Sequence, residues 1–443
     1  MIDAEKGAYD SDKQALILEI ALERVGNLHP KGIDLSLKRI KRLMGELGNP
    51  EHQLPPVIHV AGTNGKGSTI AFIRSILEAC SYKVHAYTSP HLVEFVERIR
   101  IAGELVDKAT LIRLIENIEE INGDKPVTYF EFITATAILA MSRVPADITL
   151  LETGLGGRLD ATNIVESPLV TVLTPISIDH TKFLGNTLAE IAAEKAAIMK
   201  NGRPCVSAVQ EPCAERVIHE CARERHVDIY IENRDWVVSL DDLGRLKYES
   251  ERVQWTMHGP ALPGAHQVQN AGLALATIDL SGVTIPNIAL SDGMRGVEWP
   301  ARGQQLKYGP LVDQLPQGWE LWLDGAHNGA GAAALASMME NWQDTPVYVI
   351  AGMMDNRPAK TFFESIAAIA AGIVTVSIPN HKNSCIAEDL ANEIKTLGHD
   401  NVDFSSTVSD ALGVIIENHN NPQARIMITG SLYLAGEVLK KNG

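Results

Sequence analysis

The sequence predicts an α/β protein with a larger N-terminal domain, built on a doubly wound and mostly parallel sheet, and a smaller C-terminal α/β domain. Short apolar runs alternate with segments of helical spacing along most of the chain, which is typical of parallel sheets made from β-α units. A glycine-rich turn joins the first clear apolar run to a helix. A fresh strand–helix series begins near residue 305, and that series needs a core of its own.

Composition limits the class of protein. The chain has 443 residues, 45% of them hydrophobic, which is enough for two or three globular domains. It carries 39 Lys and Arg against 55 Asp and Glu, a formal net charge of −16, so neither nucleic acid nor a membrane surface is an expected partner. The five cysteines lack zinc-type spacing, and the N-terminal residues lack a signal-peptide pattern. We therefore expect a cytoplasmic protein with reduced thiols.

The first apolar run, Val57–Ala61, is followed by a glycine-rich turn and then by apolar residues at helical spacing. This order is typical of a P-loop-type cradle, in which backbone N–H groups and the helix dipole bind nucleotide phosphates. The predicted ATP contacts are Gly62, Thr63, Asn64, Gly65, Lys66, Gly67, Ser68 and Thr69. Val60 stands where the strict P-loop pattern has its first glycine, so the loop is of a shortened kind. The alternative is a glycine-rich turn that carries a solvated lysine.

The N-terminal domain continues with alternating elements. Before the phosphate loop we expect a helix over Lys13–Arg24 and a second helix capped by Asp34. After it we expect strands at Lys83–Tyr87, Asp147–Leu151 and Leu169–Thr174, and helices at Lys108–Ile121, from Tyr129 and at Thr187–Asn201. Trp236–His258 alternates with period 2 around Gly244, which predicts a small antiparallel β subsection.

Three polar residues follow the carboxyl ends of predicted strands, where a doubly wound sheet places its ligands. They are Ser89, Glu152 and His180. Hydroxyl, carboxylate and imidazole groups suit magnesium bound alongside phosphates, because that ion keeps waters and takes few protein ligands. Each residue also has a simpler explanation, as a turn serine, a helix cap and a loop histidine. Together they predict a site for metal and triphosphate.

Lys195 falls on the apolar stripe of the helix that begins at Thr187. It lies four residues after Ile191 and three before Ile198, which places its stem among buried side chains. A lysine in that position can direct its amine to solvent along its stem. Alternatively, it can be a neutral amine that reacts with carbon dioxide to form a carbamate near the metal. Spacing alone leaves both alternatives open.

The C-terminal domain repeats the alternation, with strands expected at Glu320–Leu323, Val347–Ala351, Ile373–Ser377 and Arg425–Ile428. We place an ATP-binding domain at 1–298, a linker at 299–304 and a Rossmann-like domain at 305–443. Arg302 in the linker could reach bound phosphate. Asn270 lies at a helix start whose amides could read a base, and an ordinary amide-rich helix start explains it equally well.

Taken together and in order, the motifs of this chain resemble the folylpolyglutamate synthase/dihydrofolate synthase family, of the Mur ligase type. They are GTNGKGS at 62–68, TSPHL at 88–92, ERIRI at 97–101, ETGLGGRLDATN at 152–163, DH at 179–180, EKAAI at 194–198, HQVQNA at 266–271, DGAHN at 324–328 and GSLYLAG at 430–436. The resemblance covers nearly the whole chain, and the set is specific where any single member would not be.

The resemblance implies an ATP-dependent ligase of folate biosynthesis, with dihydropteroate, reduced folates or both as acceptors of L-glutamate. It implies that Lys66 holds the phosphates, that Ser89, Glu152 and His180 bind magnesium (two ions), and that Lys195 is carbamylated. Lys66, Lys195 and His180 would then be the catalytic residues. The nucleotide side would include Asn270, Arg302 and Asp324, and the substrates would contact Tyr129, Phe130, His327 and Ser431. We expect the enzyme to act as a monomer.

The chain departs from the family pattern at four places: Ala197 in EKAAI, Gly329 after DGAHN, Asp355-Asn356-Arg357, where the family has Asp-Lys-Asp, and the linker Pro300-Ala301-Arg302-Gly303, with an inserted alanine or a shifted glycine. None of these departures removes a predicted catalytic group. The resemblance favours a bifunctional enzyme, with both dihydrofolate synthase and folylpolyglutamate synthase activity, but other functions remain open. They are a folylpolyglutamate synthase without the dihydrofolate synthase activity, a peptidoglycan-type Mur ligase, and a P-loop kinase or NTPase.

Overall fold

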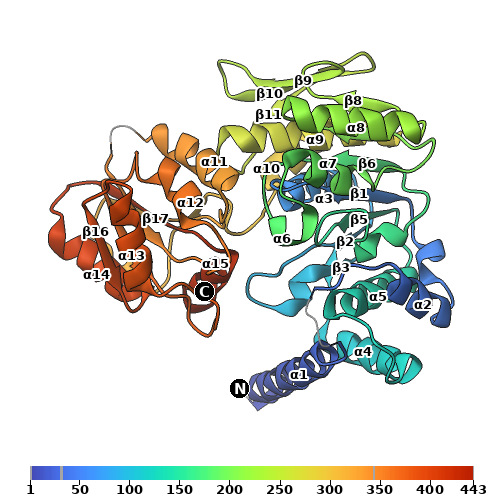
Figure 1. Ribbon diagram of the computed structural model, residues 1–443, viewed down its shortest axis with the longest axis horizontal. Coiled ribbons are helices and arrows are strands. Elements are labelled where there is room, and N and C mark those ends of the chain that lie inside the picture. The colour runs from blue at the N-terminus through green and yellow to red at the C-terminus, as the bar shows by residue number, and fades with distance from the viewer. Residues whose placement is uncertain (1, 30–32, 343–344, 443) are drawn as a thin grey trace. The chain divides into compact units, whose positions relative to one another are not determined.

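The computed structural model describes residues 2–29, 33–342 and 345–442, and the chain forms two compact units (Figure 1). Unit 1 comprises Met1–His91, Phe95–Gly259 and Asn270–Gly296. Unit 2 comprises Leu92–Glu94, Pro260–Gln269 and Val297–Gly443. These units are defined by packing alone, so the functional domains at 1–298 and 305–443 stay a prediction.

Unit 1 is organised around an eight-stranded sheet with the order β4-β3-β2-β5-β1-β6-β7-β8. Its strands are β1 (Val57–Ala61), β2 (Val84–Tyr87), β3 (Ile99–Ile101), β4 (Glu104–Leu105), β5 (Ile148–Glu152), β6 (Val170–Leu173), β7 (Cys205–Ser207) and β8 (Ile229–Ile231). The six strands β2, β5, β1, β6, β7 and β8, in their order across the sheet, pair in parallel. Strands β3 and β4 add an antiparallel edge next to β2. The central strands are buried throughout, which explains their unbroken apolar runs.

Helices cover both faces of this sheet. One layer packs against the side chains of Val57, Tyr87 and Leu151 and comprises α1 (Ile2–Gly26), α2 (Lys38–Glu46), α4 (Lys108–Asn122) and α5 (Tyr129–Ser142). A second group of helices, α7 (Leu188–Ala196) and α8 (Pro212–Glu224), forms another hydrophobic core with Ala61 of β1 and Leu173 of β6. The helix after the glycine-rich turn, α3 (Lys66–Ala79), packs on α10 (Asn287–Gly296). The predicted doubly wound sheet is therefore confirmed.

The small antiparallel subsection is also confirmed. It is a three-stranded sheet of β9 (Trp236–Leu240), β10 (Arg245–Ser250) and β11 (Gln254–His258). It lies beside α9 (Ala265–Ser281) in Figure 1. A side chain at Gly272 of that helix would come within 2.5 Å of Val238, so the glycine permits the close packing.

Unit 2 contains a six-stranded sheet with the order β12-β13-β17-β14-β15-β16. The strands are β12 (Gln304–Leu306), β13 (Trp319–Leu323), β14 (Val347–Ala351), β15 (Gly372–Val376), β16 (Val402–Ser405) and β17 (Ala424–Thr429). The helices that flank them are α11 (Gly329–Glu340), α12 (Ala359–Ile366), α13 (Ala387–Thr396), α14 (Val408–Asn418) and α15 (Leu432–Asn442). The five strands β13, β17, β14, β15 and β16 pair in parallel, so their carboxyl ends lie at the same edge of the sheet.

Two local predictions are wrong. Asp34 does not cap the second helix, because α2 begins later, at Lys38, and Leu37 is its N-cap. The Asp34 carboxylate instead accepts a hydrogen bond of 2.9 Å from Nη1 of Arg39 in α2, and Arg39 in turn donates to the distant Glu131. The helix predicted over Thr187–Asn201 starts as expected but ends at Ala196, where the backbone tightens into i to i+3 hydrogen bonds.

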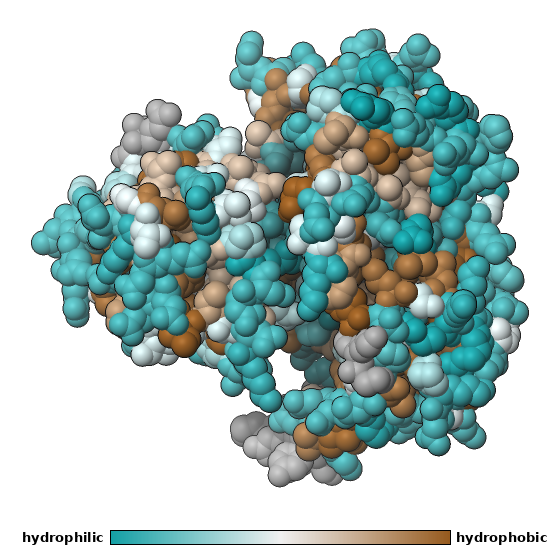
Figure 2. Space-filling model, viewed as in Figure 1, coloured by the Kyte–Doolittle hydropathy of each residue, from teal (hydrophilic) through white to brown (hydrophobic). Residues whose placement is uncertain are grey.

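Hydrophilic residues dominate the face of the molecule seen in Figure 2, in keeping with the excess of acidic side chains. Hydrophobic residues interrupt this surface in several places. Among the described residues, no helix combines the length and apolarity needed to cross a membrane.

Candidate active site

The glycine-rich turn follows β1 and closes tightly on its neighbours. A side chain on Gly62 would lie 1.8 Å from Thr174 Oγ1, and a side chain on Gly65, whose φ is +87°, would lie 2.4 Å from Asn270 Oδ1. Both positions therefore require glycine. The second contact also brings Asn270 against the loop, so these two predicted nucleotide-binding elements lie together.

Other members of the loop are held in place by the segment after β6. Thr63 Oγ1 donates to the carbonyl oxygen of Ser177 over 3.1 Å and accepts from the Ser177 N–H over 3.0 Å. Asn64 Nδ2 lies 3.5 Å from Ser177 Oγ. Among the described residues, the buried hydroxyls of Thr69 and Thr174 have no hydrogen-bond partner. Buried polar atoms of this kind beside a phosphate-type loop are what a bound anion and its water would satisfy.

Lys66 is the first residue of α3, and its side chain curls back over the loop. Its Nζ donates to the carbonyl oxygens of Gly62 and Thr63 over 3.2 and 3.3 Å, and it lies 3.9 Å from Glu152 Oε1. The side chain is 17% exposed, so the ammonium is largely shielded without being sealed from solvent. The cation therefore sits at the helix N-terminus, where negative charge is favoured.

Glu152 ends β5, and its carboxylate is 5% exposed. One of its oxygens accepts a 3.1 Å hydrogen bond from the backbone N–H of Ser89, which follows β2. Since β2 and β5 are neighbours in the sheet, the fold brings both predicted metal ligands together with Lys66.

The oxygen donors present here fit magnesium. Among the residues that the structure describes, no group of three or more His, Cys, Asp or Glu could hold a metal ion. A hard cation that is bound mainly by phosphate and water oxygens needs only one or two protein ligands, which the carboxylate of Glu152 and the hydroxyl of Ser89 can supply. His180 lies further along the loop after β6, with φ of +50°, and its backbone N–H donates to Asp179 Oδ1 over 2.7 Å.

Lys195 approaches the loop from α7. Its side chain is 5% exposed, and its Nζ donates to the carbonyl oxygen of Gly62 over 2.8 Å. The solvent-directed alternative for this lysine is therefore wrong. Burial, together with the neighbouring Lys66 ammonium, lowers the pKa of Lys195 to about 7. An amine in this state is substantially neutral near pH 7, which is the form that reacts with carbon dioxide.

The loop after Glu152 packs against both α7 and α5. A side chain on Gly157 would lie 2.6 Å from the carbonyl oxygen of Glu194, and one on Gly154 would lie 2.3 Å from the Phe130 ring. The Phe130 ring also faces Tyr87, with 6.2 Å between the ring centroids. Tyr129 and Phe130 are both half-buried, so the first turn of α5 presents two partly accessible rings.

The remaining predicted residues lie in unit 2, at the carboxyl edge of its sheet. Asp324 follows β13 and accepts hydrogen bonds of 2.8 Å from the N–H groups of Gly303 and Ala326. Arg302 lies beside it, because a side chain on Gly325 would come within 2.7 Å of Arg302 Nη1. His327 and Ser431 follow the adjacent strands β13 and β17.

Sequence patterns missed Asp160, which organises the loop from inside. It is 2% exposed, caps a short 3₁₀ turn through Thr162, and accepts a 2.8 Å hydrogen bond from the Leu155 N–H. Nε2 of the buried His59 lies 2.8 Å from Thr162 Oγ1, which extends the network into β1. Aspartate side chains commonly accept from the backbone N–H two residues later, as Asp160 does from Thr162, so the cap was visible in the sequence, whereas His59 gave no signal.

Comparison with known proteins agrees with this geometry. Residues 60–278 match the model of the Mur ligase middle domain, and residues 304–441 match that of the dihydrofolate synthetase C-terminal domain. The chain is 35% identical over 430 residues to the dihydrofolate synthase/folylpolyglutamate synthase of Bacillus subtilis, an alignment covering 93% of this chain and 95% of that protein. The chain belongs to the dihydrofolate synthase/folylpolyglutamate synthase family. Enzymes of this family are ATP-dependent ligases.

Solved structures of the family share the fold. Escherichia coli FolC in complex with DHPP and ADP has a TM-score of 0.85 and 29% identity, covering 96% of this chain and 97% of that one. A bifunctional folylpolyglutamate synthase/dihydrofolate synthase with manganese, AMPPNP and L-glutamate bound has a TM-score of 0.83 and 28% identity, covering 96% and 97%. Both relatives hold a nucleotide, and the second also holds manganese. These are the kinds of ligand that the loop around Lys66 and the carboxylate of Glu152 are suited to bind.

Proposed function

We propose that this chain uses ATP to join L-glutamate to the carboxylate of dihydropteroate and of reduced folates. The observation that carries the proposal is the convergence of Lys66, Lys195 and Glu152 on the phosphate-type loop, in a member of a family of ATP-dependent ligases. The γ-phosphoryl group of ATP passes to the substrate carboxylate, and the glutamate amine then attacks the acyl phosphate and displaces phosphate. We assign ATP and pteridine binding to residues 1–298 and glutamate binding to residues 305–443.

The first step brings a carboxylate and a triphosphate together, two anions that repel each other. Lys66 and the N–H groups at the start of α3 offset this repulsion and stabilise charge on the transferring phosphoryl group. Magnesium, when bound, neutralises charge on the phosphate oxygens. We propose that two magnesium ions bind and that their protein ligands are Glu152, Ser89 and His180. Asn270, Arg302 and Asp324 are the proposed nucleotide contacts outside the loop, and His327 and Ser431 are proposed to contact glutamate. We propose a monomer as the active form.

Carbamylation of Lys195 is part of the proposal. The neutral amine attacks carbon dioxide and loses one proton to water, so that an uncharged side chain becomes an anionic carbamate. Its support is the buried Nζ at 2.8 Å from the Gly62 carbonyl, beside the cation of Lys66, and the lowered pKa of Lys195. The carbamate would add an anion close to the proposed metal and help to orient its ligands.

Glu152→Gln is expected to lower turnover strongly and to raise the magnesium concentration needed for half-maximal activity. The amide keeps the shape of the side chain and can still accept from the Ser89 N–H, but it lacks the charge that a divalent ion requires. Phosphate release measured against magnesium concentration tests this. An unchanged magnesium requirement would mean that Glu152 is a structural acceptor for Ser89 and not a metal ligand.

Substrate scope is tested by competition. If one site serves dihydropteroate and tetrahydrofolate, each substrate should inhibit incorporation of labelled glutamate into the other competitively. Independent, non-competing reactions would contradict the single site. Activity with tetrahydrofolate alone would identify a folylpolyglutamate synthase without the dihydrofolate synthase activity, and glutamate-independent phosphate release would indicate a kinase or NTPase.

A further inference from the structure

The first turn of α5 differs from the rest of that helix. Every residue from Glu131 to Met141 is buried, whereas Tyr129 and Phe130 are only half-buried. Both rings pack against the core of unit 1 on one side and are partly accessible on the other. The Phe130 ring packs against Gly154, in the loop that follows Glu152, and faces Tyr87. A shift of this turn of α5 would therefore move an aromatic surface next to the candidate active site.

A capping box holds this turn locally. Thr128 Oγ1 accepts from the Glu131 N–H, and Glu131 Oε2 accepts from the N–H and the hydroxyl of Thr128 over 2.8 and 2.9 Å. The Glu131 side chain is 5% exposed. A carboxylate buried to this extent needs a cationic partner, because removing a charge from water is costly.

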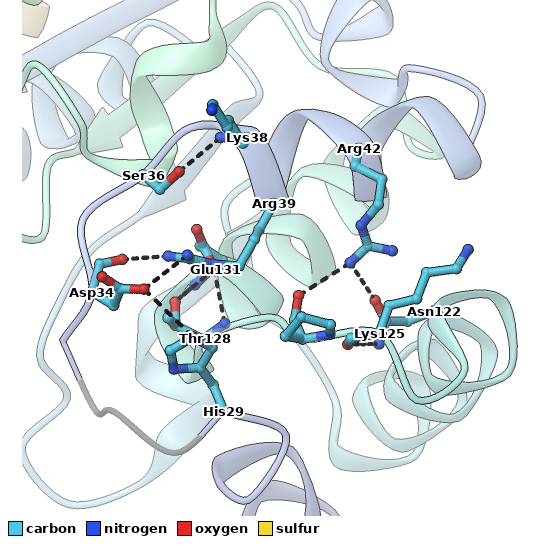
Figure 3. A network of polar contacts seen from close by, with 11 residues as sticks. His29, Asp34, Ser36, Lys38, Arg39, Arg42, Asn122, Lys125, Thr128 and Glu131 are labelled. Atoms are coloured by element: carbon cyan, nitrogen blue, oxygen red, sulfur yellow. Dashed lines mark hydrogen bonds and ion pairs between the residues drawn. The ribbon is translucent and has the colours of Figure 1, made fainter.

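Arg39 of α2 supplies that partner from another part of the sequence (Figure 3). Its Nε donates to Glu131 Oε2 over 2.9 Å, and its Nη1 donates to the Asp34 carboxylate over 2.9 Å. Its Nη2 donates to the Asp34 backbone carbonyl. With 17% of its side chain exposed, Arg39 therefore joins the segment before α2, α2 itself and the first turn of α5.

We propose that Arg39 is a positioning residue for the pteridine end of the substrate. It anchors Glu131 and so holds the first turn of α5, which keeps the rings of Tyr129 and Phe130 in the orientation that the substrate contacts. This inference rests on the proposed function and on the family resemblance, which implies that the substrate contacts Tyr129 and Phe130. Displacement of a contact surface by about 1 Å is enough to weaken binding substantially.

The chemistry requires arginine at this position. Three donors of one planar guanidinium reach two carboxylates and a carbonyl oxygen that are spread over two segments. A lysine ammonium is a point charge on a flexible stem and cannot span the same set of acceptors with fixed geometry. Lysine at residue 39 should therefore restore the charge near Glu131 while only partly restoring the position of α5.

Arg42 provides a matched control on the same helix. It also joins separate elements, since its Nη2 donates to Asn122 Oδ1 over 2.9 Å and its Nη1 donates to Glu46 over 3.0 Å. Its Nη2 also donates to the Pro126 carbonyl over 3.3 Å. In Figure 3 Arg42 contacts Asn122 at the end of α4, whereas Glu131 contacts Arg39. Loss of Arg42 removes comparable hydrogen bonds without releasing the first turn of α5.

The experiment compares Arg39→Gln, Arg39→Lys and Arg42→Gln in the full-length enzyme. For Arg39→Gln we expect the KM for dihydropteroate to rise about tenfold or more, with the KM for ATP and kcat changed by less than about twofold. Arg39→Lys should lie between that variant and the wild type, and Arg42→Gln should leave all three parameters within about twofold. An unchanged KM for dihydropteroate in folded Arg39→Gln, or an equal rise in Arg42→Gln, overturns the inference.

A second pair of variants guards against simple misfolding. Glu131→Gln keeps an acceptor for the Thr128 N–H, and the double variant with Arg39→Gln removes both charges of the buried pair, leaving only the Asp34 carboxylate, which is 36% exposed to solvent. Both should bind dihydropteroate about tenfold more weakly in direct titration without ATP, while thermal unfolding shows a folded protein. Wild-type-like binding by the folded double variant overturns the inference. Failure of the wild type itself to bind pteroates would instead refute the proposed function.

Discussion

Lys66→Ala is expected to abolish turnover while leaving the fold unchanged. Lys66 is the first residue of α3, and its partly exposed side chain lies over the phosphate loop, outside the hydrophobic core. What is lost is a cation fixed between the Gly62 and Thr63 carbonyls, where phosphoryl charge would develop. Removal of one positioned electrostatic group of this kind costs roughly 3 kcal/mol or more of transition-state stabilisation, a rate factor of at least about 100.

ATP-dependent incorporation of labelled glutamate measures this effect, with circular dichroism and thermal unfolding as checks on the fold. Lys83→Ala is a suitable control, because Lys83 is an exposed lysine of the same unit that precedes β2. Its backbone N–H, which donates to Asp147, survives the substitution. Activity of Lys66→Ala within tenfold of the wild type would mean that the loop is not the catalytic cradle.

Lys195→Ala is the second substitution with a large expected effect. It should be nearly inactive, because it removes both the buried amine at the Gly62 carbonyl and the carbamate proposed to form on it. A small carboxylate such as acetate should restore part of the activity by replacing the missing anion. In the wild type, electron density or mass spectrometry should detect the three added atoms of carbon dioxide on Lys195.

Lys200 supplies the control for that experiment. It follows α7, and its Nζ donates to the backbone carbonyl of Asn163 over 3.2 Å. Burial lowers the pKa of Lys200 as well, although Lys200 is less buried than Lys195 and its amine contacts Asn163 rather than the phosphate loop. Lys200→Ala should keep its activity and show no response to acetate. An unmodified Lys195 together with full activity of Lys195→Ala would refute the carbamate.

The carbamate should also depend on pH. Because the pKa of Lys195 lies at about 7, the reactive neutral amine predominates above that pH and the ammonium below it. At a fixed concentration of dissolved carbon dioxide, modification should therefore decline as the pH falls below about 7. The modified fraction of Lys195, measured by mass spectrometry across this range, tests that dependence.

Patterns that depend on near neighbours in the sequence predicted the structure well. The apolar runs Val57–Ala61 and Val347–Ala351 coincide with β1 and β14, and the capping box at Thr187 opens α7 as expected. The placement of Lys195 among buried residues also followed from helical spacing. Local preference combined with a continuous hydrophobic face was sufficient in these cases.

What the sequence could not predict depends on contacts between distant segments. Asp34 is a good helix cap by residue type, but its partner Arg39 draws it into a network with Glu131 of α5. Local propensity cannot anticipate a competing tertiary partner. The buried pair of His59 and Thr162 was invisible for the same reason, because the residues come from β1 and from the loop after β5.

The shared carbonyl oxygen of Gly62 has a consequence for how the enzyme balances its charges. It accepts hydrogen bonds from both Lys66 and Lys195, so two amines lie close together before any ligand arrives. Burial and repulsion from the Lys66 ammonium lower the pKa of Lys195 and favour its neutral amine, whereas a carbamate on Lys195 would attract that ammonium. Uptake of carbon dioxide would therefore turn a local repulsion into an attraction of comparable range. On this view the modification is favoured by the arrangement of the loop itself, and the supply of dissolved carbon dioxide becomes a determinant of how firmly the loop is held.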